Sequence, residues 1–553
     1  MGVRSCVAVT VAGVLAVSLG LWACGSGHSA SFGAGVSPAA LRAHLEFLAD
    51  DALEGRLTGT RGYDLAAKYM ATQFTSLGLK GGAQEGSYFQ EVPLRLTQVV
   101  PEATSVTLSA GAKTVQLGHP ADVLFFDTHQ APQGSMRAPV VFVGFGVSAP
   151  EFGYDDYQGL DVAGSIVAFL VLEAPARFPS AERGYYMDWS VKRQVASDHG
   201  AVGVLGVMTP ALETRIPWKL LENTSNSMRW LDGDGRVGGI AGSVGPVPLL
   251  SRSAAQALFD GEQHGLADIF AAADKGEPPR FQTTKLATVR YTSHHTPVES
   301  VNVLAVLEGA DPVLKQEYVV FTSHLDHLGI GTAVDGDAIY NGAFDNASGC
   351  ALLVEVARAF SQVAEKPRRS VLFAAVTAEE QALVGSDYLA HHLPVPLEKI
   401  VAIVNVDGAI PLSPGVRDVL IFGSEHSSLG PAAAQAAVES GFEVSPDPYP
   451  DQGSFVRTDH YPFVEQGVPA LYLAPGYRSN DRRVEALEAQ KKWLVTRYHS
   501  PKDDASQGFD YETGARFARF VGLVGYKVAM ESARPTWNEG DFFGKRFGRG
   551  RAR

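Results

Sequence analysis

Cysteine is scarce in this sequence, because the 553 residues contain only Cys6, Cys24 and Cys350. Cys6 and Cys24 lie within the N-terminal leader considered below, so no pair remains for an intramolecular disulfide. This excludes a fold built on disulfide bonds. Cys350 lies in an apolar stretch that we predict to be helical, so we expect a small buried side chain and not a metal ligand.

Net positive charge is also lacking, since 46 Lys and Arg residues oppose 60 Asp and Glu residues and give a formal net charge of −14. A charge of this sign argues against nucleic acid as the main partner. Basic residues at the C-terminal end are interleaved with glycine, so we expect residues 536–553 to form a basic flexible tail. Beyond the leader, no apolar run reaches the ~18 residues that indicate a membrane-spanning helix.

Residues 1–24 have the pattern of a signal peptide. Arg4 supplies positive charge, and residues 7–21 form an apolar stretch that is short for a membrane span. The ending Ala23-Cys24, followed by glycine and serine, resembles the lipobox of bacterial lipoproteins, in which the cysteine becomes the lipidated N-terminus. We therefore expect export, either as a cell-envelope lipoprotein anchored to the membrane through Cys24 or as a secreted protein without lipid.

Two domains are expected, because 553 residues exceed what one hydrophobic core commonly holds. Ser37 before Pro38 is typical of a helix start, and a second helix is expected from about residue 63. Short apolar runs separated by turn residues then indicate strands at 139–143, 165–170, 201–207 and 247–250. We predict that residues 96–290 form a β-rich unit inserted into the first domain.

After Thr296, apolar strands and helices alternate, which indicates an α/β fold with a mostly parallel central sheet between helices. Two strands, 301–306 and 318–322, are almost continuously apolar, as expected for strands buried on both faces. Later strands are expected at 370–377, 400–406, 419–422 and 470–473, and helices at 347–360, 385–393, 429–439 and 512–530. Residues 37–95 and 291–535 together would form this domain.

Polar side chains able to bind a metal occur mostly where these strands end or the next helix begins. They are His324, Asp326, Asp345, Glu379, Glu380, Asp407 and His499, the last preceded by Tyr498. Because open α/β sheets bind ligands beyond the carboxyl ends of their strands, we expect these groups to meet at one edge. We expect His426, by contrast, to be a solvated surface side chain.

Imidazoles and carboxylates together suit zinc, whose catalytic sites keep one position open for water. Five ligands are enough for two ions if one carboxylate bridges them, and the sequence offers His324, Asp345, Glu380, Asp407 and His499. Asp326 stands two residues after His324, where its carboxylate can orient the imidazole ring.

The adjacent pair Glu379-Glu380 fits two different tasks. Neighbouring side chains at a strand end point in different directions, so one can bind metal while the other faces bound water. A carboxylate beside such water can act as general base and pass the proton to the leaving amine. Metal binding lowers the pKa of water toward about 7, so hydroxide is available at neutral pH.

In their order and type, these residues resemble the motifs of the co-catalytic zinc exopeptidases, the family that includes bacterial secreted aminopeptidases and glutamate carboxypeptidase. The resemblance implies two Zn²⁺ ions per chain. It implies His324 and Asp407 as ligands of the first ion, Glu380 and His499 as ligands of the second, and Asp345 as the bridge between them.

The same resemblance implies roles for three further features. Glu379 would be the general base, Tyr498 would stabilise the tetrahedral oxyanion, and the peptide bond Asp345–Asn346 would be cis. Residues 159–167 and 200–204 resemble protease-associated domains, so the insert at 96–290 is expected to be of that kind and to shape access to the site.

The predicted function is an exported zinc-dependent aminopeptidase that hydrolyses N-terminal peptide bonds with metal-bound hydroxide, with Glu379 as base. Acidic residues near the metals can hold a free α-amino group, which favours this function over the alternatives. A carboxypeptidase or dipeptidase of the same family stays open, since Arg457, Arg478 and Arg497 can bind a terminal carboxylate. Also open are a glutaminyl cyclase, which shares the fold with one zinc, and a non-catalytic binding protein on the same scaffold.

Overall fold

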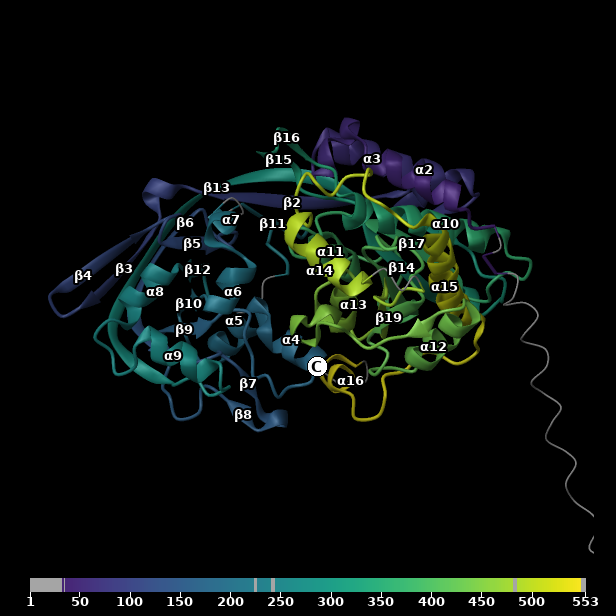
Figure 1. Cartoon of the computed structure of the whole chain (residues 1–553). Coiled ribbons are helices and arrows are strands. Elements are labelled where there is room, and N and C mark those ends of the chain that lie inside the picture. The colour runs from purple at the N-terminus through teal and green to yellow at the C-terminus, as the bar shows by residue number, and fades with distance from the viewer. Residues whose placement is uncertain (1–31, 34, 223–225, 240–243, 481–484, 549–553) are drawn as a thin grey trace, which may run out of the picture.

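The computed structural model describes residues 32–33, 35–222, 226–239, 244–480 and 485–548. The predicted signal peptide, including Cys6 and Cys24, and residues 549–553 lie outside this range. Within it, the chain forms two lobes joined by two long strands, β2 (Phe89–Val99) and β13 (Phe281–Leu307) (Figure 1). Among these described residues, no helix is both long and apolar enough to cross a membrane.

A mixed sheet with a parallel centre organises the larger lobe and confirms the predicted fold class. Strand β14 (Tyr318–His324) is parallel to β17 (Ser370–Val376) on one side and to β18 (Ile400–Val406) on the other. Strand β21 (Ala470–Pro475) continues the parallel set beside β18. The outer neighbours are antiparallel: β13 beside β17, and β19 (Asp418–Phe422) beside β21.

Helices cover both faces of this sheet. One face carries α2 (Pro38–Leu48), α3 (Arg61–Ser76), α10 (Ser348–Gln362), α12 (Leu429–Glu439) and α15 (Tyr511–Met530). The other face carries α11 (Val384–His391) and α13 (Tyr461–Glu465). Because side chains alternate along a strand, Phe321 packs in the first layer and its neighbour Val320 in the second.

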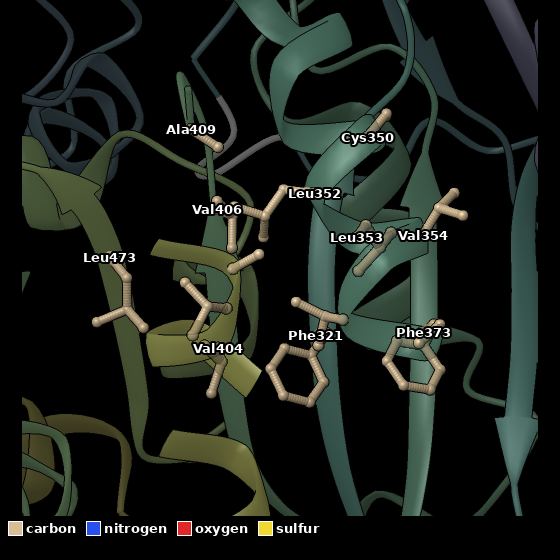
Figure 2. Packing of buried hydrophobic residues seen from close by; sticks show 14 of the residues in the cluster. Phe321, Cys350, Leu352, Leu353, Val354, Phe373, Val404, Val406, Ala409 and Leu473 are labelled. Atoms are coloured by element: carbon tan, nitrogen blue, oxygen red, sulfur yellow. The ribbon is translucent and has the colours of Figure 1, made fainter. Parts of the chain in front are cut away.

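The layer beneath α10 is built from large apolar side chains. Figure 2 shows side chains of α10, among them Leu353, beside Phe321 of β14 and Phe373 of β17. The two phenyl rings stack with centroids 5.5 Å apart. Cys350 is fully buried in the same layer as a free thiol, which confirms the prediction of a small buried side chain.

The smaller lobe corresponds to the predicted insert and contains a second sheet. Its strands are β3 (Ser105–Ala110), β4 (Lys113–Gly118), β5 (Val123–Phe126), β6 (Gln133–Phe142), β9 (Ile166–Leu170), β10 (Gly203–Val207) and β12 (Val247–Leu250). Strands β6, β9, β10 and β12 run parallel in that order. The lobe contains more helix than a β-rich unit would, namely α4 (Ser180–Met187), α5 (Trp189–Asp198), α6 (Pro210–Arg215), α7 (Trp218–Leu221), α8 (Arg252–Phe259) and α9 (Leu266–Ala273).

Strand β13 belongs to both lobes. Its first part pairs with β3 and β6, and its second part pairs with β2 and then β17. The sequence predicts a strand only at residues 301–306 and places the boundary of the insert at residue 290, inside this strand. The prediction missed the first part because it alternates polar and apolar residues without a long apolar run.

The C-terminal segment is not the flexible tail that the sequence predicts from residue 536. Helix α16 (Phe542–Phe547) lies between the lobes near α4 (Figure 1), and Phe543 is fully buried. The ring of Phe542 lies 5.4 Å from that of Tyr185 in α4, and the Arg546 guanidinium lies 4.6 Å above the same Tyr185 ring. Aromatic residues between the basic ones therefore dock this segment.

His426 anchors this segment and is itself buried, contrary to the predicted surface position. Its Nδ1 lies 2.7 Å from Oδ2 of Asp541, whose Oδ1 accepts the amide of Gly544 at the start of α16. Burial alone would lower the pKa of His426, but the hydrogen bond with Asp541 raises it above its ordinary value.

This contact should stabilise the fold in a pH-dependent way. A raised histidine pKa contributes stability fully below the unfolded value near 6.5 and loses it as the pH rises through the folded value. We expect Asp541→Asn, which keeps the helix cap, to lower the free energy of unfolding by about 1.5–3 kcal/mol near pH 6 and by less near pH 9. Denaturant titration of both proteins at the two pH values measures this, and an equal loss at both would contradict it.

Candidate metal centre

The predicted ligands come from five separate places at one edge of the sheet. His324 is the last residue of β14, and Asp407 directly follows β18. Glu380 follows β17 by a short loop, Asp345 lies just before α10, and His499 follows α14 (Ala486–Thr496). The parallel strands β14, β17 and β18 all end here, so their carboxyl ends gather these loops, as the sequence predicts.

Asp345 stands between two groups of potential ligands. Its Oδ1 lies 3.2 Å from Nε2 of His324, which is also 3.5 Å from Oδ1 of Asp407. Its Oδ2 lies 3.3 Å from Nε2 of His499, which is 3.1 Å from Oε2 of Glu380. The structure therefore brings all five predicted ligands together, with one carboxylate shared between two imidazole–carboxylate groups.

The donor atoms fit divalent metal ions. Nε2 of His324 and Nε2 of His499 are both buried and lack a hydrogen-bond partner within the described residues. The ring N–H of His324 at Nδ1 donates to the main-chain carbonyl of Asp326 at 3.2 Å, which leaves Nε2 as the free lone pair. Potential ligand atoms of His324, Asp345 and Asp407 lie within 4.8 Å of one another. Nitrogen and carboxylate oxygen at this spacing form a donor set typical of zinc.

Two further buried carboxylates hold the ligand loops in place. Asp503 accepts the amide of Phe344 at 2.9 Å and the amide of Asp345 at 3.0 Å. Asp326 accepts the amides of Glu379 and Glu380 at 3.1 and 3.3 Å. Each carboxylate therefore fixes two consecutive residues of a loop that presents a candidate ligand.

Asp326 acts on His324 differently from the sequence prediction. Its carboxylate oxygen Oδ1 lies 3.9 Å from Nδ1 of His324, beyond hydrogen-bond distance, and the closer contact is the main-chain carbonyl. The carboxylate itself serves the Glu379–Glu380 loop. The peptide bond between Asp345 and Asn346 is cis, as the resemblance implies.

Histidine rings and carboxylates lie close together at the site, and their charges shift each other's pKa values. Burial alone would lower the pKa of His324, but the charges of Glu379 and Asp407 hold it well above its usual range. Burial alone would raise the pKa of Glu380, but the charge of His499 lowers it to about 2. A divalent cation at this edge would replace the histidine protons, so metal binding should release protons and weaken as the pH falls.

Glu379 and Tyr498 lie beside the ligands without belonging to the two groups. The Glu379 side chain is 16% exposed, and its Oε2 lies 4.0 Å from Nε2 of His324. Tyr498 is 44% exposed, and its ring stacks on that of His499 with centroids 3.8 Å apart. Asp459 is buried close by, and burial raises its pKa to about 7.

His327 is a site residue that the sequence analysis missed. Its Nδ1 lies 2.7 Å from Oε1 of Glu380, and its buried Nε2 has no hydrogen-bond partner within the described residues. Potential ligand atoms of His327, Asp345 and Glu380 also lie within 4.8 Å of one another. The available signal was the motif His324-Leu-Asp-His327, in which a second imidazole stands near a candidate ligand.

Comparisons with known proteins point to one family. Residues 302–524 match the profile of Peptidase family M28. Aminopeptidase NAALADL1 of Mus musculus is 35% identical over 113 residues, which are 20% of this chain and 13% of that protein. A probable zinc metalloprotease of Leptosphaeria maculans is 33% identical over 255 residues, which are 40% of this chain and 56% of that protein.

A solved structure extends the likeness to most of the fold. The aminopeptidase from Aneurinibacillus sp. strain AM-1 matches with a TM-score of 0.51 at 19% sequence identity, covering 92% of this chain and 97% of that chain. The two proteins therefore share a fold that includes both lobes. The two curated relatives named above are matched over less than two thirds of their own length.

The geometry separates His499, which faces two ligand oxygens, from His327, which hydrogen-bonds the far oxygen of Glu380. We expect His499→Ala to lower the number of metal ions bound per chain by one. We expect His327→Ala to keep the number and to weaken affinity by about 10–100-fold, because it removes only the orienting hydrogen bond. Titration calorimetry with Zn²⁺ on metal-free protein measures both. Loss of an ion in His327→Ala with none in His499→Ala would reverse the assignment.

Proposed function

We propose that this chain, whose residues 302–524 match the profile of Peptidase family M28, is an exported zinc-dependent aminopeptidase. The observation that carries the proposal is Asp345, which shares its two oxygens between the His324–Asp407 and the His499–Glu380 groups. A shared carboxylate of this kind is what a pair of catalytic metal ions needs. The two relatives described above, an aminopeptidase and a probable zinc metalloprotease, support the same activity.

Two zinc ions per chain are part of this proposal. His324 and Asp407 would hold one, His499 and Glu380 the other, and Asp345 both. When bound, such ions supply Lewis acidity and lower the pKa of water to about 7. The fixed amides of the Asp345 and Glu380 loops, held by Asp503 and Asp326, keep these side chains in position before any metal binds.

Glu379 would act as the general base. Its carboxylate is partly exposed and reaches into the site beside His324, while the amide of its own residue is fixed by Asp326. There it can take a proton from the attacking water and deliver it to the nitrogen of the leaving amine. Tyr498, exposed beside His499, can donate a hydrogen bond from its hydroxyl to the oxyanion that forms from the peptide carbonyl.

A free α-amino group is the substrate feature that the charges of the site favour. Glu379 and Asp407 are the more exposed carboxylates, with side chains 16% and 21% accessible. An ammonium group beside them would gain favourable charge interactions. Peptides with a free N-terminus are therefore the proposed substrates.

The insert and the leader complete the proposal. Residues 96–290 would be a protease-associated-like domain that shapes access, supported by the contact of Arg183 in α4 with Asp451 in the larger lobe. The signal-peptide pattern of residues 1–24, which lies outside the described range, supports export and a lipid anchor at Cys24.

The role of Glu379 can be tested by Glu379→Gln, which removes the base but keeps the side-chain shape. We expect a folded protein with unchanged metal content and a kcat lower by about 10²–10⁴-fold. The matched control is Glu46→Gln, an exposed side chain paired with Arg42 far along the chain from the site. Turnover of peptide substrates measures both variants, and normal turnover by Glu379→Gln would remove this residue from the mechanism.

The terminus that the enzyme recognises can be tested with blocked peptides. We expect release of the first residue from a peptide amidated at its C-terminus and no cleavage after acetylation of its N-terminus, because the acetyl group removes the positive charge. Mass spectrometry of the products separates the outcomes. Cleavage of the acetylated peptide from its C-terminal end would indicate a carboxypeptidase, and cyclisation of an N-terminal glutamine with one bound zinc would indicate a glutaminyl cyclase.

A further inference from the structure

A short strand of the insert contacts the loop that bears Glu379 and Glu380, and its arginine reaches the loop backbone. This strand is β11 (Ser227–Trp230), which pairs with β2, and the arginine is Arg229. Its Nη1 donates to the main-chain carbonyl of Gln381 at 3.0 Å. Gln381 directly follows the pair of glutamates, so Arg229 reaches the backbone next to the candidate base and ligand.

Arg229 is itself held by a half-buried acid of the smaller lobe. Its Nη2 lies 2.7 Å from Oδ1 of Asp127, whose other oxygen accepts a hydrogen bond from Nη1 of Arg193 at 2.9 Å. The side chains of Asp127 and Arg193 are 12% and 3% exposed. Burial alone would raise the pKa of Asp127, but the two guanidinium groups hold it below its usual range. The carboxylate is therefore a charged, fixed anchor for Arg229.

The contacted loop needs external contacts because its backbone is strained. Ala378, Ala382 and Leu383 have φ values of 54°, 71° and 61°, in the left-handed region that side chains with a Cβ disfavour. Backbone of this kind persists when surrounding contacts over-determine it. The amide of Ala378 is held by Thr58, and those of the two glutamates by Asp326.

The second half of the loop depends on strand β11 of the insert. The Gln381 carbonyl is bound by Arg229, and Asp387, early in the following helix α11, accepts Nε1 of Trp230 at 2.6 Å. Trp230 and Met228 also pack with Ala378 and Val384 in one apolar cluster. Strand β11 thus supports both ends of the segment from Ala378 to Asp387.

We propose that Arg229 of the insert, anchored on Asp127, is a positioning residue that sets the Glu379–Glu380 loop for catalysis. The inference rests on the proposed function, and it makes the insert part of the catalytic apparatus and not only a boundary of the substrate path. A guanidinium suits this task because its fork lets it bind a carboxylate and a carbonyl at once.

Three variants test it. Arg229→Met removes both contacts, and Arg229→Lys keeps a charge for Asp127 but has no fork to bridge to Gln381. Arg236→Met is the matched control, since this exposed arginine of the insert pairs with the exposed Asp234. Hydrogen–deuterium exchange of the 378–385 segment and steady-state kinetics on an unblocked peptide are measured for each.

We expect faster exchange at this segment and a kcat about 10–100-fold lower in Arg229→Met and Arg229→Lys, with KM little changed and the control like wild type. A substitution that only destabilises the fold would lower the melting temperature, but it would not lower kcat selectively while KM stays unchanged. If Arg229→Met does not fold, Arg229→Lys decides. Unchanged exchange, or faster exchange with normal kcat, overturns the proposal. If wild-type protein cleaves no peptide, the proposed function fails, and the positioning role is then decided by exchange and by Zn²⁺ affinity.

Discussion

The arrangement of the larger lobe depends on five acidic side chains that lie close together at one edge of its sheet. Asp326, Asp345, Glu379, Glu380 and Asp407 all lie there with little access to water. Buried like charges are costly unless cations or hydrogen-bond donors compensate them. Here His324 and His499 face the ligand carboxylates, and main-chain amides face Asp326. The remaining negative charge is what a divalent cation at this edge would neutralise.

This confinement explains the arrangement of the rest of the larger lobe. The candidate ligands lie on separate loops between His324 and His499, so the strands that precede these loops must fix their positions. Arg56, from the N-terminal segment, is fully buried and donates to the carbonyls of Leu325 and Gly342, which flank two of the ligand loops. Asp503 then ties the C-terminal part of the chain to the amide of Asp345. The site is thus assembled from both ends of the domain.

Much of this could be predicted from the sequence, for identifiable reasons. The strands β14, β17 and β18 are largely apolar runs, and candidate ligands lie at or soon after their ends. Both the fold class and the meeting of these ligands at one sheet edge could therefore be predicted. His327 was missed because a single imidazole has no spacing of its own and its partner Glu380 lies 53 positions away. Helix α16 was misjudged because charge and glycine suggested a solvated tail, while the packing of Phe543 depends on a surface that only the folded lobes create. The hydrogen bonds that Asp326 accepts from two main-chain amides could not be predicted either, because a main-chain partner does not depend on residue type.

The unbroken course of β13 through both sheets has a mechanical consequence. Proteins that close around their ligands usually bend at a few loop residues between rigid bodies. Here the joint is a ribbon of two hydrogen-bonded strands, β2 and β13, in register from Ser293 to Val303. Such a ribbon resists bending in its plane and yields mainly by twisting. The relative position of the two lobes is therefore fixed when the chain folds, because both partners of this ribbon continue from one lobe into the other.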